Sequence, residues 1–377
     1  MQERVEQPQV RPVAGKREFK QFIDYQYDRN RADARFIPPL RLGEIDRLTP
    51  RRNPFFAHAD VQLFLAHRNG SIVGRVAAID DRRHNETHGD NIAAFGFFEA
   101  EDAAASRALL GQVEAWARAK GRVAVRGPLN PSLNESAGLL IDGFDTDPML
   151  MMPRNPPEYA AFIEGAGYEK VKDLYAWISD IGRELDSGIR RVAARVQREL
   201  HITVRPFDLR EFATETERLR EIYCGAWENN WGFVPPTPEE FKRIATEMKP
   251  IFDPRCAVLA EIGGRPVACA VAVPDINQAL RGTDGRLFPF GLVRLLGRRW
   301  IIDQIRLMLL GVLPEYRSTG IYPLLIVEMQ KLVRANTDFK RVEFSWVLED
   351  NDAINNTVAR MGAVRYQTYR IYQKAIA

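Results

Sequence analysis

The sequence predicts an α/β (α+β) protein made of two similar halves, each a mixed, mainly antiparallel sheet flanked by helices. Residues 66–81 resemble residues 260–275 at an offset of 260 − 66 = 194, and each segment reads as two apolar strands joined by a glycine turn. A short helix followed by a Tyr-rich strand recurs in the same order, at 155–178 and at 351–372. The 377 residues are 45% hydrophobic and 27% charged, which is typical of globular domains.

These repeats divide the chain into four parts. We expect a flexible N-terminal tail at 1–16, a first domain at 17–180, a linker helix at 181–200 and a second domain at 201–377. A chain of this length usually folds around more than one core, which agrees with two domains.

Helical periodicity supports the main helices of both halves. Residues 103–120 carry apolar side chains at helical spacing, and 323–335 is the counterpart in the second half. Residues 190–200 read as a connecting helix, and 201–207 begins the second half as a strand. Asn155 and Asn351 are each predicted to cap the short helix that follows.

Charge and cysteine content exclude several classes of protein. Lys and Arg number 53 and Asp and Glu 50, a net charge of +3, so we expect no nucleic-acid partner. Three widely spaced cysteines predict reduced thiols in a cytoplasmic protein and no metal site. The first residues contain no apolar signal segment, and no stretch is apolar enough to predict a transmembrane helix.

A turn in the second half has the features of an anion site. An apolar strand at 305–313 is followed by a short turn that contains Gly320, and Pro323 then opens a helix. Glycine allows a ligand to approach the backbone closely. The N–H groups of the turn and of the helix N-terminus would both face a phosphate.

This arrangement resembles the GNAT superfamily of acyl-CoA-dependent N-acyltransferases, whose pyrophosphate loop reads Arg/Gln-x-x-Gly-x-Gly/Ala. Arg317 and Gly320 match that motif, and Tyr322 departs from it at the last position. The resemblance implies acetyl-CoA or another acyl-CoA as co-substrate and a small-molecule or peptide amine as acceptor. The implied CoA-binding residues are Val312, Leu313, Arg317, Ser318, Thr319, Gly320, Ile321, Tyr322 and Asn351.

The first half resembles a second, degenerate GNAT domain. It lacks the Arg-x-x-Gly loop, and Glu99, Glu101 and Asp102 stand where phosphates would bind, so repulsion should disfavour CoA there. The whole chain is similar to a group of bacterial tandem-GNAT proteins that carry Gly-Phe-Asp at 143–145, Asn-Pro-Pro at 155–157 and an aromatic segment at 227–233.

The superfamily's usual catalytic acid is missing from this sequence. The superfamily places a Tyr four residues before a closing glycine, and here that position is Val358, before Gly362. Tyr366 and Tyr369 are candidate substitutes and Glu343 is a candidate base, although each is also explained as a packing or surface residue. The resemblance places the wall of the acceptor pocket at Trp227, Asn230, Trp231 and Phe233, with core packing as the alternative.

Three functions remain open at this stage. The first is acyl transfer to an amine, with CoA held by the second half. The others are a Fem-type aminoacyltransferase, which the near-neutral charge disfavours, and a non-catalytic binding module, which Val358 and Tyr322 favour. An inserted basic and apolar segment at 282–300 is predicted to be a helix that forms a lid, contacts a membrane surface or packs between the halves.

Overall fold

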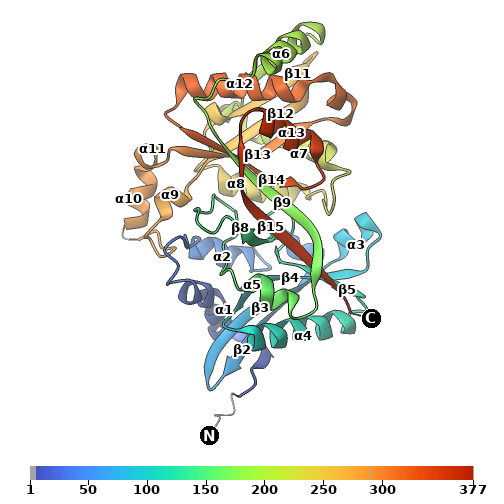
Figure 1. Ribbon diagram of the computed structural model, residues 1–377, viewed down its shortest axis with the longest axis vertical. Coiled ribbons are helices and arrows are strands. Elements are labelled where there is room, and N and C mark those ends of the chain that lie inside the picture. The colour runs from blue at the N-terminus through green and yellow to red at the C-terminus, as the bar shows by residue number, and fades with distance from the viewer. Residues whose placement is uncertain (1–5, 289, 377) are drawn as a thin grey trace. The chain divides into compact units, whose positions relative to one another are not determined.

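The computed structural model describes residues 6–288 and 290–376 and divides the chain into two compact units (Figure 1). Unit 1 comprises Met1–Leu174, Leu280–Phe288 and Gln367–Ala377, and unit 2 comprises Tyr175–Ala279 and Pro289–Tyr366. Each unit contains a mixed sheet with helices on both faces, so the predicted fold class is confirmed.

The sheet of unit 1 has the strand order β1-β2-β3-β4-β5-β15. Strands β4 and β5 are parallel, and the other neighbours are antiparallel. The strands are β1 (Gln9–Pro12), β2 (Ala59–Arg68), β3 (Ser71–Asp81), β4 (Ile92–Ala100), β5 (Ala124–Gly127) and β15 (Val364–Ala375); β8 (Leu139–Asp142) also pairs with β15, and β6 (Leu129–Asn130) pairs with β7 (Ser136–Ala137).

Helices cover both faces of this sheet. The apolar side chains of α4 pack on one face, and those of α1 pack on the other. The helices of unit 1 are α1 (Gly15–Arg29), α2 (Arg41–Arg47), the 3-10 helix η1 (Pro54–Ala57), α3 (Arg82–His88), α4 (Ala103–Ala119) and α5 (Tyr159–Glu164).

The sheet of unit 2 has the order β9-β14-β13-β12-β11-β10. Strands β13 and β14 are parallel, and β10 to β13 form antiparallel pairs. The strands are β9 (Glu169–Asp180), β10 (Thr203–Pro206), β11 (Ala257–Ile262), β12 (Arg265–Pro274), β13 (Gln304–Val312) and β14 (Arg341–Leu348).

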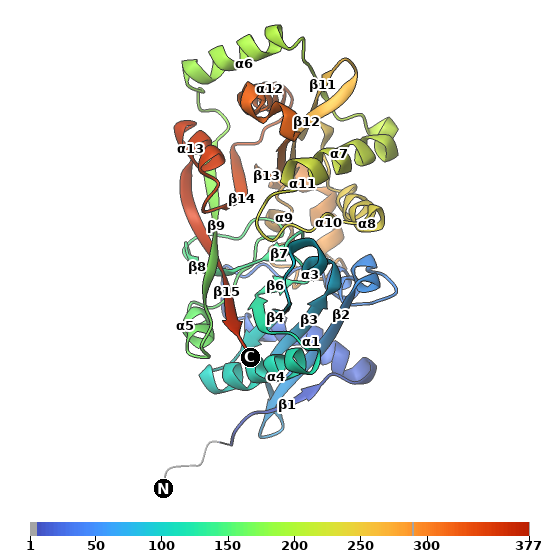
Figure 2. The ribbon, with the colours of Figure 1, turned by 90° about the vertical axis from the view of Figure 1, so that its right-hand side faces the viewer.

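The two faces of this sheet carry different helices. Helix α12 packs on one face with α6 beside it (Figure 2), and α7 and α8 cover the other face. The helices of unit 2 are α6 (Ser187–Glu199), η2 (Leu209–Glu211), α7 (Phe212–Trp227), α8 (Pro238–Met248), η3 (Pro254–Cys256), α9 (Asn277–Leu280), α10 (Phe290–Leu296), α11 (Arg298–Ile301), η4 (Pro314–Thr319), α12 (Ile321–Asn336) and α13 (Asp352–Arg360).

Three expectations differ from the structure. The predicted flexible tail forms β1 instead, which pairs with β2, although residues 1–5 lie outside the described part. The insertion at 282–300 forms two short helices, α10 and α11, rather than one. Asn155 does not cap α5, because the N-cap of that helix is Glu158. Instead, the Asn155 side chain accepts the Leu140 N–H at 2.8 Å and donates to the Leu140 carbonyl at 3.2 Å.

Two long strands, β9 and β15, are each divided between the two units. Strand β9 begins in unit 1 and ends in unit 2, whereas β15 begins in unit 2 and ends in unit 1 (green and red in Figure 1). The division of the sequence at 180 and 201 therefore remains a prediction about repeat units, because the compact units do not follow one cut in the chain.

Candidate active site

The two parallel strands of unit 2 separate at a fork. Their paired residues end at Leu307 and Phe344, and in the described chain no later pair joins them, although β13 continues to Val312. The separation starts at a β-bulge: Leu307 pairs with β12 and so does Leu309, which leaves Met308 as the extra residue. Past the fork, β13 presents backbone groups on the side where β14 has moved away, and an extended ligand can pair with such an edge.

The turn after β13 leads directly into an uncapped helix. Helix η4 ends at Thr319, Gly320 follows with a φ of +88°, and α12 begins at Ile321. No side chain caps the N-terminus of α12. Its first N–H groups carry the positive end of the helix dipole. Ser318 in this turn is exposed, whereas the Thr319 hydroxyl donates to the Tyr316 carbonyl at 2.6 Å.

Arg317, the predicted phosphate contact, binds backbone in this structure. Its guanidinium donates to the carbonyls of Gly225 and Ala226 at 3.3 and 2.8 Å, which are the last turn of α7. A positive group at a helix C-terminus is favourable. The contact fixes η4 against α7 and thereby sets the shape of the turn.

The other predicted CoA residues lie around the same turn. Val312, Leu313 and Ile321 are buried in the core, and Tyr322 is half-buried with a pKa raised by burial. Asn351 caps α13 by accepting the Ile354 N–H at 3.2 Å, as predicted for a cap.

Helix α6 covers one side of Gly320. A Cβ atom added to this glycine would lie 3.0 Å from Val192 and 3.2 Å from Val196, both on α6. The glycine is therefore required both by its positive φ and by this close contact. A ligand at the N-terminus of α12 would approach from the side that α6 leaves open.

A buried carboxyl lies next to the fork, on β14. Glu343 is fully buried, and the hydroxyls of Ser345 and Tyr366 both donate to its carboxyl oxygens. The Arg306 guanidinium lies 3.7 Å from the same carboxyl and donates to Ser345 Oγ at 2.7 Å. Burial raises the pKa of Glu343, and Arg306 with the two hydroxyl donors acts in the opposite direction.

Strand alternation determines the face on which this cluster lies. Val342 and Phe344 line an apolar cavity of about 50 Å³ beneath α12, so Glu343 and Ser345 point to the opposite face of the sheet. That face is the one covered by α7 and α8. Because the cavity is small and lined mostly by apolar side chains, a long acyl chain would enter it only if those side chains moved.

The predicted acceptor wall packs on this α7 face. The Trp227 ring lies so close to Gly311 of β13 that an added Cβ would meet it at 2.6 Å. Trp227 and Phe233 both contact the ring of Tyr223, with centroids 4.9 and 5.1 Å apart. Core packing therefore accounts for these two residues, whereas Asn230 and Trp231 are partly exposed.

The two candidate tyrosines have different surroundings. Tyr366 is partly exposed, lies in unit 2 and bonds Glu343. Tyr369 is fully buried, lies in unit 1 and donates its hydroxyl to Gln367 at 2.7 Å. The structure thus joins Tyr366 with Glu343 into one cluster, which Tyr369 does not enter.

Sequence reasoning missed two members of this cluster, Arg306 and Ser345. A signal was present, since Arg306 is a charged residue in the middle of a strand that is otherwise apolar. Buried charges are rare unless they are paired, so the arginine predicts a buried acid on a neighbouring strand.

The equivalent region of unit 1 is filled by the chain itself. The recorded pairs of β4 with β5 end at Ala94 and Arg126, and the Asn130 side chain then accepts the N–H of Phe97. At the start of α4, Asp102 caps the helix by accepting the Ala105 N–H at 2.9 Å. At both places the backbone N–H is thus bonded by a side chain of the chain itself.

The three carboxylates predicted to repel phosphates do not act alike. Asp102 occupies the helix N-terminus, where the Arg68 guanidinium holds it through two hydrogen bonds of 2.6 and 3.0 Å. Glu99 points into the core, where Tyr159 donates to it at 2.7 Å, and Glu101 is exposed.

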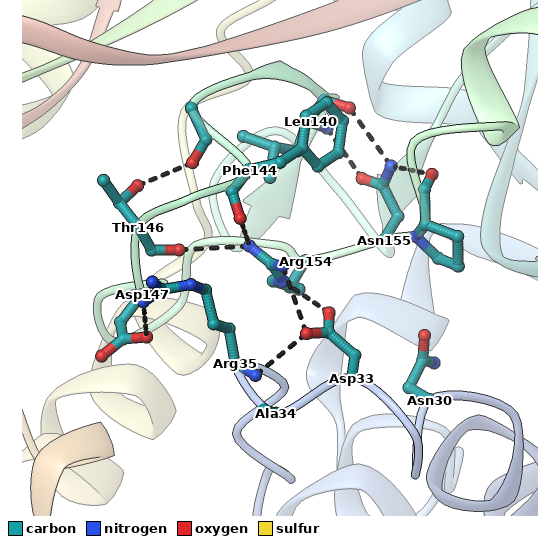
Figure 3. Close-up of polar contacts among 12 residues, drawn as sticks. Asn30, Asp33, Ala34, Arg35, Leu140, Phe144, Thr146, Asp147, Arg154 and Asn155 are labelled. Carbon is teal, nitrogen blue, oxygen red and sulfur yellow. Dashed lines mark hydrogen bonds and ion pairs between the residues drawn. The ribbon is translucent and has the colours of Figure 1, made fainter.

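The sequence signatures of the first half build a loop in unit 1 (Figure 3). Arg154 donates to both carboxyl oxygens of Asp33 at 2.7 and 3.2 Å and to the carbonyls of Phe144 and Thr146 at 3.0 and 3.1 Å. Asn155, the next residue, holds the backbone of β8. The Gly-Phe-Asp and Asn-Pro-Pro signatures are thus explained by loop architecture.

The described part of the chain shows neither a metal-binding cluster of side chains nor a membrane-spanning helix. Among residues 6–288 and 290–376, no three His, Cys, Asp or Glu side chains gather as a metal site would require. No helix within these ranges has the length and hydropathy needed to cross a bilayer.

Two curated proteins are similar to this chain over nearly its full length. A bacterial ceramide synthase from Caulobacter vibrioides is 36% identical over 376 residues, which cover 97% of each chain. The protein YghO from Escherichia coli is 36% identical over 374 residues, covering 97% of this chain and 95% of YghO. No model of a protein family matches the chain.

Solved structures share the fold. A tandem GNAT protein from the clavulanic acid biosynthesis pathway is 12% identical, with a TM-score of 0.56 and coverage of 98% and 99% of the two chains. A GCN5-related N-acetyltransferase from Anabaena variabilis is 10% identical, with a TM-score of 0.53 and coverage of 98% and 73%. The chain therefore has a tandem GNAT fold, as its sequence predicted.

Proposed function

Because the chain belongs to the family that contains the bacterial ceramide synthase of Caulobacter vibrioides and YghO of Escherichia coli, we propose that it is an acyl-CoA-dependent N-acyltransferase. A ceramide is the amide of a fatty acid with a long-chain amino alcohol. The proposed acceptor is therefore the primary amine of a long-chain base, and the proposed donor is a fatty acyl-CoA. The sequence alone implied acetyl-CoA or another acyl-CoA as donor and a small-molecule or peptide amine as acceptor. The proposal specifies a fatty acyl donor and a long-chain amine.

The open fork between β13 and β14 is the observation that carries the proposal. The pantetheine arm of CoA is an extended chain with two amides, and it would pair with the backbone of β13 after Leu307. The pyrophosphate would then reach the turn at Ser318 and the uncapped start of α12. In this proposal Arg317 shapes the turn and need not touch the phosphates.

The reaction needs few groups. The amine nitrogen attacks the thioester carbonyl, the C–N bond forms and the C–S bond breaks. The nitrogen loses a proton and the leaving thiolate gains one, so no other reactant is needed. A group that exchanges protons near both atoms accelerates such a step.

Tyr366 is the proposed proton-transfer residue. The residue is partly exposed and its hydroxyl is hydrogen-bonded to Glu343, whereas Glu343 itself has no exposed surface. We assign the phenol the role of donating a proton to the leaving sulfur. Glu343, with Arg306 and Ser345, is a positioning residue that orients this phenol and stabilises its changes of charge.

A non-catalytic binding module is the second candidate. Val358 is fully buried at the position where the superfamily has its catalytic tyrosine, and two valines of α6 cover one side of Gly320. Such a module would bind acyl-CoA without turnover.

The first experiment is a calorimetric titration of the full chain with palmitoyl-CoA and with CoA. Ser318→Glu places a carboxylate in the turn at an exposed position without backbone strain. Repulsion between this carboxylate and the CoA phosphates should weaken binding about a hundredfold. Ala104→Glu, at the start of α4 in unit 1, is the matched control and should bind as the wild type does.

Turnover is tested separately. The wild type is incubated with palmitoyl-CoA and sphinganine, and the N-acyl product is detected by mass spectrometry. Binding with product supports the transferase, and binding without product for a panel of amines would favour the binding module. Equal weakening by Ser318→Glu and Ala104→Glu, or no binding at all, would overturn the placement of CoA in unit 2.

A further inference from the structure

Helices α10 and α11 of unit 2 present a group of exposed apolar side chains. Val293, Leu296 and Trp300 are 66, 70 and 74% exposed, and they follow one another at intervals of three and four residues. This spacing places side chains on one face when helices continue one another, and only Gly297 separates α10 from α11. Single exposed apolar residues are ordinary, but a contiguous group of large ones marks a contact surface.

The same segment carries unbalanced positive charge. Residues 290–302 contain three arginines and no Asp or Glu. Within the described part of the chain, Arg294, Arg298 and Arg299 form no ion pair: the first two donate to backbone carbonyls, and Arg299 lies 4.0 Å from the ring of Trp300. Cationic and apolar groups therefore occur together, and of the three arginines Arg298 also interacts electrostatically with Asp253.

We propose that α10 and α11 (orange in Figure 1) form a docking surface for a bilayer that contains anionic lipids. The apolar side chains would enter the boundary between headgroups and acyl chains, where tryptophan is favoured. The arginines would pair with lipid phosphates. Both helices are far too short to span a bilayer, so the surface would lie in the plane of the membrane.

Charge complementarity favours a lipid surface over a protein partner. A protein that covers this patch would have to bury several arginines or supply carboxylates for them, and burying an unpaired charge is costly. At a membrane surface the guanidinium groups remain hydrated while the apolar groups are buried, so one geometry satisfies both. This inference does not depend on the acyltransferase proposal, because it concerns adsorption and not turnover.

The test is co-sedimentation of the full chain with vesicles. Phosphatidylcholine vesicles are compared with vesicles in which about one-third of the lipid is phosphatidylglycerol. We expect binding to the anionic vesicles, weaker binding at high salt, and at least about a tenfold loss for Leu296→Asp/Trp300→Asp. Arg298→Gln/Arg299→Gln should reduce the preference for anionic lipid while leaving the apolar face intact.

The matched control is Leu42→Asp, on α2 of unit 1, because Leu42 is 61% exposed. It should sediment as the wild type does. Equal binding of the wild type and the double aspartate variant would overturn the inference, as would a wild type that stays in the supernatant with anionic vesicles. If the double aspartate variant instead dissociates a dimer that binds no vesicles, the surface is a contact between copies and the inference also fails.

Discussion

The strand–helix junctions of the two units differ in what occupies them. In unit 1, Asn130 fills the gap beside β4 and Asp102 caps α4, with Arg68 holding that carboxylate in place. In unit 2, the pairing of β13 with β14 ends at Leu307, and α12 starts at Ile321 without a side-chain cap. The same fold can therefore bond its strand edge and helix end with its own side chains, as in unit 1, or start the corresponding helix without a side-chain cap, as in unit 2.

The largest effect is expected on kcat, when Tyr366 of unit 2 is compared with Tyr369 of unit 1. Tyr366→Phe removes the hydroxyl next to the fork, and kcat should fall by about 10²- to 10⁴-fold while binding of acyl-CoA is unchanged. Tyr369→Phe removes a buried hydroxyl of unit 1 that bonds Gln367, and kcat should stay within about threefold. Product formation with saturating palmitoyl-CoA measures both. Equal losses in the two variants would show that the phenol of Tyr366 has no special role.

The second prediction concerns Asn130, whose side chain bonds the backbone beside β4 in unit 1. Asn130→Ala leaves the N–H of Phe97 without its side-chain acceptor, and the free energy of unfolding should fall by about 1–3 kcal/mol. The loss is read from urea denaturation. Asn91→Ala, which removes two exposed side-chain bonds, to the Gly121 carbonyl and from the Arg122 guanidinium, is the control and should change stability by less than about 0.5 kcal/mol. A smaller loss at Asn130 than at Asn91 would mean that this contact does not stabilise unit 1.

The smallest predicted effect concerns the cap of α4 and depends on pH. Hydrogen bonds from Arg68, with backbone N–H groups of α4, lower the pKa of Asp102 to about 2. Since the folded pKa lies below the unfolded value, the stabilisation is present above about pH 4 and is lost as the pH falls towards 2. Asp102→Ala should cost about 1 kcal/mol at pH 7, taken from helix capping because the side chain is partly exposed.

Urea unfolding of the wild type and Asp102→Ala at pH 7 and near pH 2 measures this difference. Asp102→Asn keeps a capping oxygen and is the matched variant, so it should lose less than alanine does. A cost of Asp102→Ala that is the same at both pH values would contradict the assigned role of the charged carboxylate.

Local pattern in the sequence predicted the long helix of the first half and the repeat, but it predicted one helix at 282–300 where the structure has two. The apolar spacing of 103–120 predicted α4 to within one residue, and the repeated hairpins predicted two like sheets. Asn155 shows where such reasoning fails. An Asn before a helix has the same sequence signal whether it caps that helix or binds a neighbouring strand, and only the fold decides between them.

The candidate site was predicted in part for a similar reason. The turn at Gly320 has a local signature, because a positive φ and a helix start leave traces in nearby residues. The cluster at Glu343 has a weaker signature: Ser345 is its neighbour on β14, and the charged Arg306 stands out in an apolar strand, but Arg306 meets Glu343 only when β13 lies beside β14. The bulge at Met308 is likewise a property of strand pairing, which one strand's sequence does not encode.

The exchange of β9 and β15 has a consequence for synthesis of the chain. In unit 1, β5 pairs with β4 on one side and with β15 on the other. Tyr372 of β15 pairs with Gly127 of β5, and the two residues are 372 − 127 = 245 positions apart in the chain. At ~5–20 residues per second, a ribosome needs about 12–50 s to make that stretch. During this time the edge of β5 has no strand partner from β15, so the nascent chain would need a chaperone, or its own later residues, to protect it from aggregation.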